Sequence, residues 1–191
     1  MNKYLLNLNK NNGFTLVELM VATSIFIVIL IVIIGSLITS SDSSKKAQAL
    51  RFAMDNVNFA MESMSRSIRT GTNYYCANEI PFSVTGTSDC PSGDIFIAFN
   101  PQNSTSYVAY AKVPRGNDTF TLKRCDIDND ICTEMVSSEV DIEALKFFVK
   151  GSDKTDDIQP SVYILMKGTI NIKGVPTSFA IQTMASSRTL E

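Results

Sequence analysis

The chain has 191 residues, of which 17 are basic and 19 acidic, and it contains no histidine. The absence of histidine excludes His-dependent catalytic triads and His metal sites, and it removes the commonest general base. Residues 71–191 hold 10 basic and 15 acidic side chains, a net charge of −5, which argues against the clustered basic surface that nucleic-acid binding needs. The sequence also lacks a complete nucleotide-binding or nucleophile motif. We therefore expect neither an enzyme nor a nucleic-acid partner.

The N-terminus consists of a short polar segment followed by a long apolar run. Residues 1–13 contain Lys3 and Lys10 and no acid, and the run from Phe14 to Ile38 has Glu18 as its only ionisable side chain. About 20 apolar residues, each rising about 1.5 Å, cross a bilayer core, so residues 14–38 predict a transmembrane helix. The run is too long for a signal-peptide core. The basic residues ahead of it predict a cytoplasmic N-terminus and an outward-facing C-terminal domain.

The start of the run has the sequence Gly13-Phe14-Thr15-Leu16-Val17-Glu18-Leu19. It resembles the processing motif of the type IV pilin family, which includes the pseudopilins of type II secretion. The resemblance implies that residues 1–13 are a leader, that a prepilin peptidase cuts between Gly13 and Phe14, and that the new Phe14 amine is methylated. It also implies that Glu18 faces the Phe14 amine of a neighbouring subunit in a filament. The alternative is an uncleaved single-pass anchor with one tolerated glutamate.

The Glu18 carboxylate is energetically unfavourable inside an apolar segment and needs a partner of opposite charge. A charge inside a bilayer segment costs roughly 2.5 to 3.5 kcal/mol on insertion scales. Glu18 lies one helical turn from the new N-terminus, where the helix dipole favours an anion, so pairing within its own subunit is an alternative to pairing between subunits. Because a buried polar pair between chains is well suited to fixing register, we expect Glu18 to set the stagger between subunits.

Beyond the apolar run the helical pattern continues. Apolar residues recur at spacings of three and four, which predicts that residues 39–70 extend the helix outside the membrane. This stripe consists of Ala47, Leu50, Met54, Val57, Met61, Met64 and Ile68. Arg66 and Arg69 precede Gly71, a pattern typical of a helix end with a left-handed glycine cap. We expect the stripe to pack under a sheet, since it has too few repeats for a coiled-coil seam.

Residues 71–191 alternate short apolar runs with Asn, Asp, Gly and Pro, the pattern of strands and turns. The expected strands are 94–99, 107–113, 119–124, 142–150, 161–172 and 177–184. The residues expected to face the helix are Ile95, Ile97, Leu122, Phe147, Ile164, Met166 and Ile181. The sequence thus predicts an α+β fold with a long N-terminal helix that spans the membrane in its first half. Its second half should pack on a mainly antiparallel sheet of a β-rich, disulfide-containing domain.

Four cysteines lie in this outward-facing domain: Cys76, Cys90, Cys125 and Cys132. An even number of cysteines outside the membrane predicts disulfides, and four cysteines allow three pairings. The sequential pairing is the simplest of the three. The first bond would then close the loop that leaves the helix, and the second would join the arms of a hairpin. Neither interval has the Cys-x2-4-Cys spacing of a tetrahedral zinc site.

The sequence between the second pair of cysteines suggests calcium as the one candidate cofactor. Asp126, Asp128 and Asp130 alternate in the way that the first ligands of a calcium loop do. The pattern stops there, because Ile131 stands where the turn glycine belongs and Ser137 where a bidentate glutamate belongs. The alternative is a solvated acidic hairpin tip.

Together these features predict a minor pilin or pseudopilin, inserted once in the cytoplasmic membrane and later part of a cell-surface or periplasmic filament. The length and the Arg-x-x-Arg-Thr-Gly helix exit resemble W-type minor pilins and J-type pseudopilins, which implies a role at the tip or in starting assembly. The implied partners are the prepilin peptidase, other pilin or pseudopilin subunits and the inner-membrane assembly platform.

Two alternative functions stay open at this stage. The first is a type II secretion pseudopilin, which shares the processing motif. The second is a filament-tip adhesin or other ligand-binding module, for which an exposed aromatic groove would be the sign. The tyrosines available for such a groove serve equally well as core residues, and they are Tyr74, Tyr75, Tyr107 and Tyr110.

Overall fold

The computed structural model describes residues 13–187 apart from 82, 103, 117 and 154–157, so all of the expected leader except Gly13 lies outside the described residues. The chain divides into two compact units, residues 1–45 and 46–191. The described residues form one helix, α1 (Leu16–Arg69), followed by eight strands. The strands are β1 (Thr72–Ala77), β2 (Phe96–Asn100), β3 (Val108–Gly116), β4 (Thr119–Asp126), β5 (Ile131–Glu134), β6 (Val140–Lys150), β7 (Ser161–Ile172) and β8 (Val175–Ser186).

The end of α1 lies where the sequence predicts, but its cap differs from the prediction. Gly71 is not left-handed, and Asn73 takes that conformation instead, with a φ of 54°. The buried Tyr74 hydroxyl lies 2.7 Å from the carbonyl oxygens of Ile68 and of Gly71, so it satisfies acceptors that the helix end leaves open. Gly71 is required for close packing, because a Cβ there would lie 2.4 Å from Cδ2 of Phe99.

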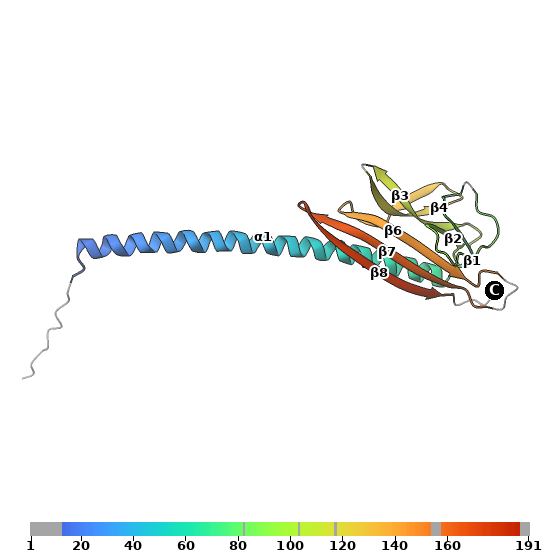
Figure 1. Ribbon diagram of the computed structural model, residues 1–191, viewed down its shortest axis with the longest axis horizontal. Helices are drawn as coiled ribbons and strands as arrows, with labels where there is room; N and C mark the ends of the chain where they lie inside the picture. The colour runs from blue at the N-terminus through green and yellow to red at the C-terminus, as the bar shows by residue number, and fades with distance from the viewer. Residues whose placement is uncertain (1–12, 82, 103, 117, 154–157, 188–191) are drawn as a thin grey trace, which may run out of the picture. The chain divides into compact units, whose positions relative to one another are not determined.

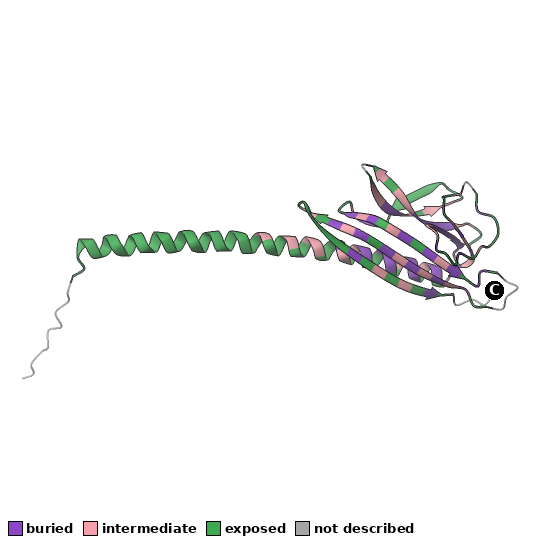
Figure 2. Ribbon diagram, in the orientation of Figure 1, coloured by how far each residue is buried: buried purple, intermediate pink, exposed green. Residues whose placement is uncertain are grey.

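The apolar stripe on the second part of α1 packs against the strands, as predicted. Its last four members are buried, and they are Val57, Met61, Met64 and Ile68. Leu50 and Met54 are half-buried against the same core, whereas Ala47 is exposed. Figure 2 shows this part of the helix carrying its buried residues where the strands cover it. The stripe therefore belongs to the core of residues 46–191.

The strands form two sheets in which every pairing is antiparallel. One sheet has the order β1-β2-β3-β4-β5 and the other the order β6-β7-β8. The three-stranded sheet lies along the last part of α1 (Figure 1). The five-stranded sheet meets the three-stranded one mainly where β4 and β3 approach β6. The fold is thus α+β with a helix packed on antiparallel sheet, as predicted, although the strands divide into two sheets where one was expected.

The sequence pattern misses two of the eight strands, β1 and β5. β1 contains a bulge between Thr72 and Tyr75, which disturbs the alternation that would reveal it. β5 has four residues, all of them exposed, and it is too short to show an alternating apolar pattern. The other six strands lie where predicted, and their bounds differ by no more than three residues.

Most of the residues expected to face the helix are in the core. The buried ones are Ile97, Leu122, Phe147, Ile164 and Met166. Ile181 is half-buried against the same core. The prediction for Ile95 is wrong, because this residue precedes β2 and is only half-buried. β2 instead uses Phe96 and Ala98 to fill a second, smaller core on the other face of the five-stranded sheet.

Two disulfides join the four cysteines in sequential order. Cys76 and Cys90 have Cα atoms 6.3 Å apart, and the Cys90 N–H donates to the Val149 carbonyl of β6 at 3.1 Å. Cys125 and Cys132 face each other directly across β4 and β5, with Cα atoms 4.1 Å apart. The first disulfide therefore connects β1, at the helix exit, to the three-stranded sheet. The second closes a single hairpin.

Loss of the first disulfide should cost more stability than loss of the second. In the chain-entropy account a loop of about 15 residues is worth roughly 3 kcal/mol, and a shorter loop somewhat less. The two bonds close separations of 14 and 7 residues. Both double Cys→Ser variants should still fold, because a domain of this size buries an adequate core. Denaturant unfolding without reductant measures the two losses, and a larger loss from the Cys125–Cys132 pair would contradict the expectation.

Arg115, at the end of β3, holds the segment that crosses from one sheet to the other. Its guanidinium donates to Glu134 Oε2 at 2.9 Å and to backbone carbonyls of residues 136, 137, 138 and 140 at 3.1–3.4 Å. From the other side, Oδ1 of Asn56 in α1 accepts from the Ser137 N–H at 2.8 Å. The hydrogen bond and charge of Arg115 hold the pKa of the Glu134 carboxyl below its ordinary value. We call these contacts of Arg115, Glu134, Asn56 and residues 136–140 the junction. It joins the helix to both sheets.

Arg115→Ala should lower the free energy of unfolding by about 2 to 3 kcal/mol, because it removes a donor that several partly buried carbonyls share. Arg115→Lys is the matched control: it keeps the charge but lacks the fork that reaches several acceptors at once. It should recover only part of the loss. Denaturant unfolding at neutral pH compares the three proteins, and equal stability of Arg115→Ala and the parent would exclude the junction as a stabilising feature.

The junction should also make stability depend on pH in the acid range. Because the pKa of Glu134 is lowered in the folded protein, its contribution is present above the ordinary value of 4.5 and is lost as pH falls through the folded pKa. Glu134→Gln should therefore weaken the fall in unfolding free energy below that pH. An acid profile that is the same in both proteins would show that other carboxyls dominate it.

Candidate processing and assembly site

The bond predicted to be cleaved lies in exposed, non-helical chain. Gly13, Phe14 and Thr15 are not helical, and α1 begins at Leu16, two residues later than the apolar run suggests. The Phe14 side chain is 82% exposed, and a Cβ added to Gly13 would meet no atom within 4 Å. Exposed chain outside regular structure is what a peptidase can take into its active site. The helix start therefore leaves the Gly13–Phe14 bond accessible.

Thr15 is the N-cap of α1, a role that the sequence analysis did not assign. Its Oγ1 accepts a hydrogen bond from the Glu18 N–H at 3.3 Å, and its carbonyl accepts from the Leu19 N–H at 3.2 Å. Thr15 and Glu18 have the Ser/Thr-x-x-Glu spacing of a capping box, which is the signal that identifies the cap. The cap places the Glu18 carboxylate in the first helical turn, near the positive end of the helix dipole.

The first part of α1 is apolar on all sides. Its large side chains from Leu16 to Ile38 are exposed, and Figure 2 shows this part of the helix without buried residues. This part of the helix is long and apolar enough to cross a membrane, and none of it is buried inside the protein. By length and composition the helix suits a membrane span. A helix that is apolar all round requires lipid or other helices around it, so Glu18 must find its partner in such surroundings.

The acidic hairpin tip does not gather its carboxylates. Asp126 accepts hydrogen bonds from the Asn129 backbone N–H at 3.3 Å and from the Asn129 side-chain amide at 2.9 Å. The hydrogen bond from the Asn129 side-chain amide holds the pKa of the Asp126 carboxyl below its ordinary value. Among the described residues, Asp126, Asp128 and Asp130 do not form a group whose ligand atoms all lie within 4.8 Å of one another, and calcium binding stays a prediction. Asp126 thus shapes the turn of the hairpin.

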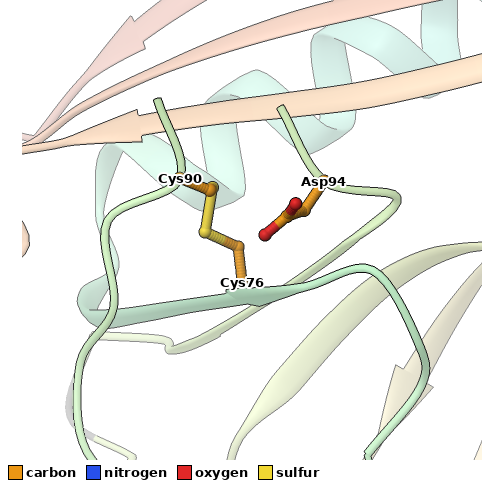
Figure 3. A group of neighbouring side chains, drawn as sticks. All are labelled: Cys76, Cys90 and Asp94. Carbon is orange, nitrogen blue, oxygen red and sulfur yellow. A yellow bond between two sulfur atoms is a disulfide. The ribbon is translucent and has the colours of Figure 1, made fainter. Parts of the chain in front are cut away.

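One cluster of metal-ligand residue types occurs in the described part of the chain, and it consists of Cys76, Cys90 and Asp94 (Figure 3). Their ligand atoms lie within 4.8 Å of one another. Both sulfurs are joined in a disulfide, and a metal needs a thiolate. Asp94 also exchanges two backbone hydrogen bonds with Phe147, at 2.8 and 2.9 Å. The cluster is therefore a structural corner on the edge of β6.

The tyrosines expected either in a groove or in the core are core residues. Tyr74 and Tyr110 are 0% and 1% exposed, and their rings lie 6.1 and 5.9 Å from that of Phe99. Tyr75 and Tyr107 are half-buried against the smaller core. They do not form an exposed aromatic groove, so the ligand-binding alternative loses the feature that would have supported it.

Comparison with known proteins identifies the N-terminal segment. Residues 8–38 match the family described as the prokaryotic N-terminal methylation motif. The match contains Gly13, Phe14, Thr15 and Glu18 and ends at Ile38, where the apolar run ends. No curated protein and no solved structure matches the chain significantly. The N-terminal segment therefore carries the prokaryotic N-terminal methylation motif, which supports the type IV pilin and pseudopilin family.

Proposed function

We propose that this chain is a minor pilin or pseudopilin, a structural subunit at the tip, or in the starting complex, of a type IV pilus or related filament. The observation that carries the proposal is the arrangement of residues 13–18. An exposed peptide bond directly precedes a capped apolar helix with one carboxylate in its first turn, and this stretch lies within the methylation motif. Such a motif points to a structural subunit rather than an enzyme.

The proposal gives each residue of the site a role. Cleavage after Gly13 creates a positively charged amine on Phe14, while the Thr15 hydroxyl caps the helix through the Glu18 N–H. Among the described residues no ion pair engages the Glu18 carboxylate. Pairing it with the Phe14 amine of a neighbouring subunit offsets the cost of holding both charges away from water. The pair then selects one stagger between adjacent helices.

In this proposal the subunit is first inserted in the membrane and then cleaved and assembled. It is first anchored in the cytoplasmic membrane through residues 14–38, with residues 71–191 outside. The prepilin peptidase removes residues 1–13, and the inner-membrane assembly platform then adds the mature chain to other subunits. All four cysteines are paired in disulfides, which suits an oxidising compartment outside the cytoplasm.

Mass spectrometry of the protein isolated from its cell envelope tests the proposal. The expected mature chain begins at a methylated Phe14 and lacks residues 1–13. A population that retains Met1 throughout would contradict it. Deleting the gene and scoring surface filaments against secreted proteins then separates the two systems, because loss of filaments alone indicates a pilus and loss of secretion indicates a type II pseudopilin.

A further inference from the structure

The three-stranded sheet has one covered edge and one open edge. On the β6 side, Asp94 pairs with Phe147 and the Cys90 N–H donates to the Val149 carbonyl, so the segment around residues 90–94 covers that edge. On the other side lies β8, whose partner is β7. Within the part of the chain that the structure describes, no backbone hydrogen bond reaches residues 176–186 from outside the β7–β8 pair.

The register of β8 determines which of its backbone groups are open. Lys173 and Gly174 form a two-residue turn with φ values of 51° and 80°, as in a type I′ hairpin. The flanking residues Ile172 and Val175 are therefore a hydrogen-bonded pair, and the odd-numbered residues of β8 bond to β7. The N–H and C=O groups of the even-numbered residues point away from the sheet. Pro176 occupies one of these even positions, so it removes no bond to β7.

β8 carries one of the features that normally protect an edge strand, Pro176 at its first outward position, and lacks the others beyond it. Edges are commonly blunted by proline, by charged side chains, by bulges or by short length. β8 has 12 residues, none of them charged, and it pairs with β7 without a register shift. Its outward side chains are exposed and uncharged, and they are Ser178, Ala180, Gln182, Met184 and Ser186. From residue 178 onward the strand therefore presents an open row of donors and acceptors.

The chemistry of this edge selects an extended strand as its occupant. Alternating N–H and C=O groups are matched by the backbone of another extended chain, which adds to the sheet by β-augmentation. Since β8 offers no charge for a salt bridge, uncharged side chains suit the facing strand best. We propose that the free edge of β8 binds an extended, uncharged strand of a different subunit of the same filament. This inference rests on the proposed function.

A second copy of this chain is a poorer fit to the edge. Two β8 strands pair antiparallel about a two-fold axis, which would make residues 46–69 of the two copies run in opposite directions. Two copies anchored through residues 14–38 in one membrane enter their domains from the same side. A copy could otherwise offer an edge of its five-stranded sheet, which is β1 or β5. On β1 the Tyr74 carbonyl already accepts from the Ser88 N–H, and β5 has four residues, includes Glu134 and follows the acidic tip. The occupant is therefore expected to have another sequence.

Photo-crosslinking of the full-length chain in its own cells tests the proposal. A photoreactive residue at Gln182 should crosslink to another chain, and peptide mass spectrometry should identify that chain as one with its own N-terminal methylation motif. The matched control carries the photoreactive residue at Lys146. Its side chain is exposed, and it lies on β6, the strand whose edge is covered by residues 90–94. A crosslink only to a second copy, or a yield no higher than that of the control, would overturn the proposal.

Substitutions at Ala180 separate edge pairing from mere proximity. Ala180→Pro removes an outward N–H and leaves the ladder with β7 intact, and Pro176 shows that the strand accepts proline at an even position. The crosslink from position 182 should fall by about fivefold, the effect of one net hydrogen bond. Ala180→Ser keeps the N–H and should crosslink normally. Ala180→Lys, which changes only the side chain, is a second variant that should also reduce the yield.

Two readouts keep the outcomes distinct. Formation of both disulfides shows that each variant is folded, so undiminished crosslinking in the folded Pro and Lys variants would overturn edge pairing. A mature N-terminus at Phe14 and presence of the protein in filaments report on the proposed function separately. If the variants have a normal N-terminus, are present in filaments and crosslink as well as the parent protein, the edge proposal fails and the filament role stands.

Discussion

Replacing Gly13 with aspartate is expected to leave the chain at its full precursor length, with no band of mature size on a gel. The substitution has no folding cost in the structure, because a Cβ at Gly13 meets nothing within 4 Å and the residue has no positive φ. The requirement for glycine therefore comes from outside the folded chain. A prepilin peptidase must bring an extended, flexible backbone to its catalytic aspartates, and a bulky charged side chain beside the bond obstructs that approach.

Gly13→Ala is the matched control for this experiment. It adds a methyl group without charge, in the same open space, and should be cleaved more than Gly13→Asp. Both variants should form both disulfides, which shows that the exported domain is folded. A mature-sized band from Gly13→Asp would mean that cleavage does not depend on this position.

The N-terminal half of the molecule is predictable because its signals are local. A single carboxylate in an apolar run, such as Glu18, stands out in the sequence whatever the rest of the chain does. The stripe from Leu50 to Ile68 repeats with the helical period, so its buried face follows from spacing alone. The Cys125–Cys132 disulfide is also predictable, because these two cysteines are close in sequence and face each other in the hairpin of β4 and β5. The cap residue Thr15 is not among the predictions, although its spacing to Glu18 is equally local, and the C-terminal cap differs from the predicted glycine.

The domain is less predictable because its arrangement depends on contacts far apart in sequence. Arg115 donates to carbonyls about 20 residues away, and no local pattern marks it. The division into two sheets depends on how the segment after β5 crosses between them. The open edge of β8 is visible only once the register with β7 and the cover over β6 are known. Alternation identifies strands, but it does not say which edges meet.

Glu18→Ala is expected to be cleaved normally and yet to enter filaments poorly. The substitution removes a carboxylate that costs roughly 2.5 to 3.5 kcal/mol in a bilayer, so anchoring is not impaired. The helix cap also survives, because Thr15 Oγ1 accepts from the backbone N–H of residue 18, which alanine retains. In the proposed filament, the substitution removes the partner of the neighbouring subunit's Phe14 amine. An unpaired buried charge costs about 3 to 5 kcal/mol, so incorporation should fall by about a hundredfold or more.

The measurement is the ratio of the mature chain in sheared filaments to that left in the membrane. Asp55→Ala is the matched control, since it removes an exposed acid from the same helix outside the apolar run and should incorporate normally. Normal incorporation of Glu18→Ala would mean that the carboxylate does not set the stagger and that the Phe14 amine finds its counter-charge elsewhere. Accumulation of uncleaved Glu18→Ala would instead assign the carboxylate to recognition by the peptidase, because the cap that positions the cleaved bond is unchanged in this variant.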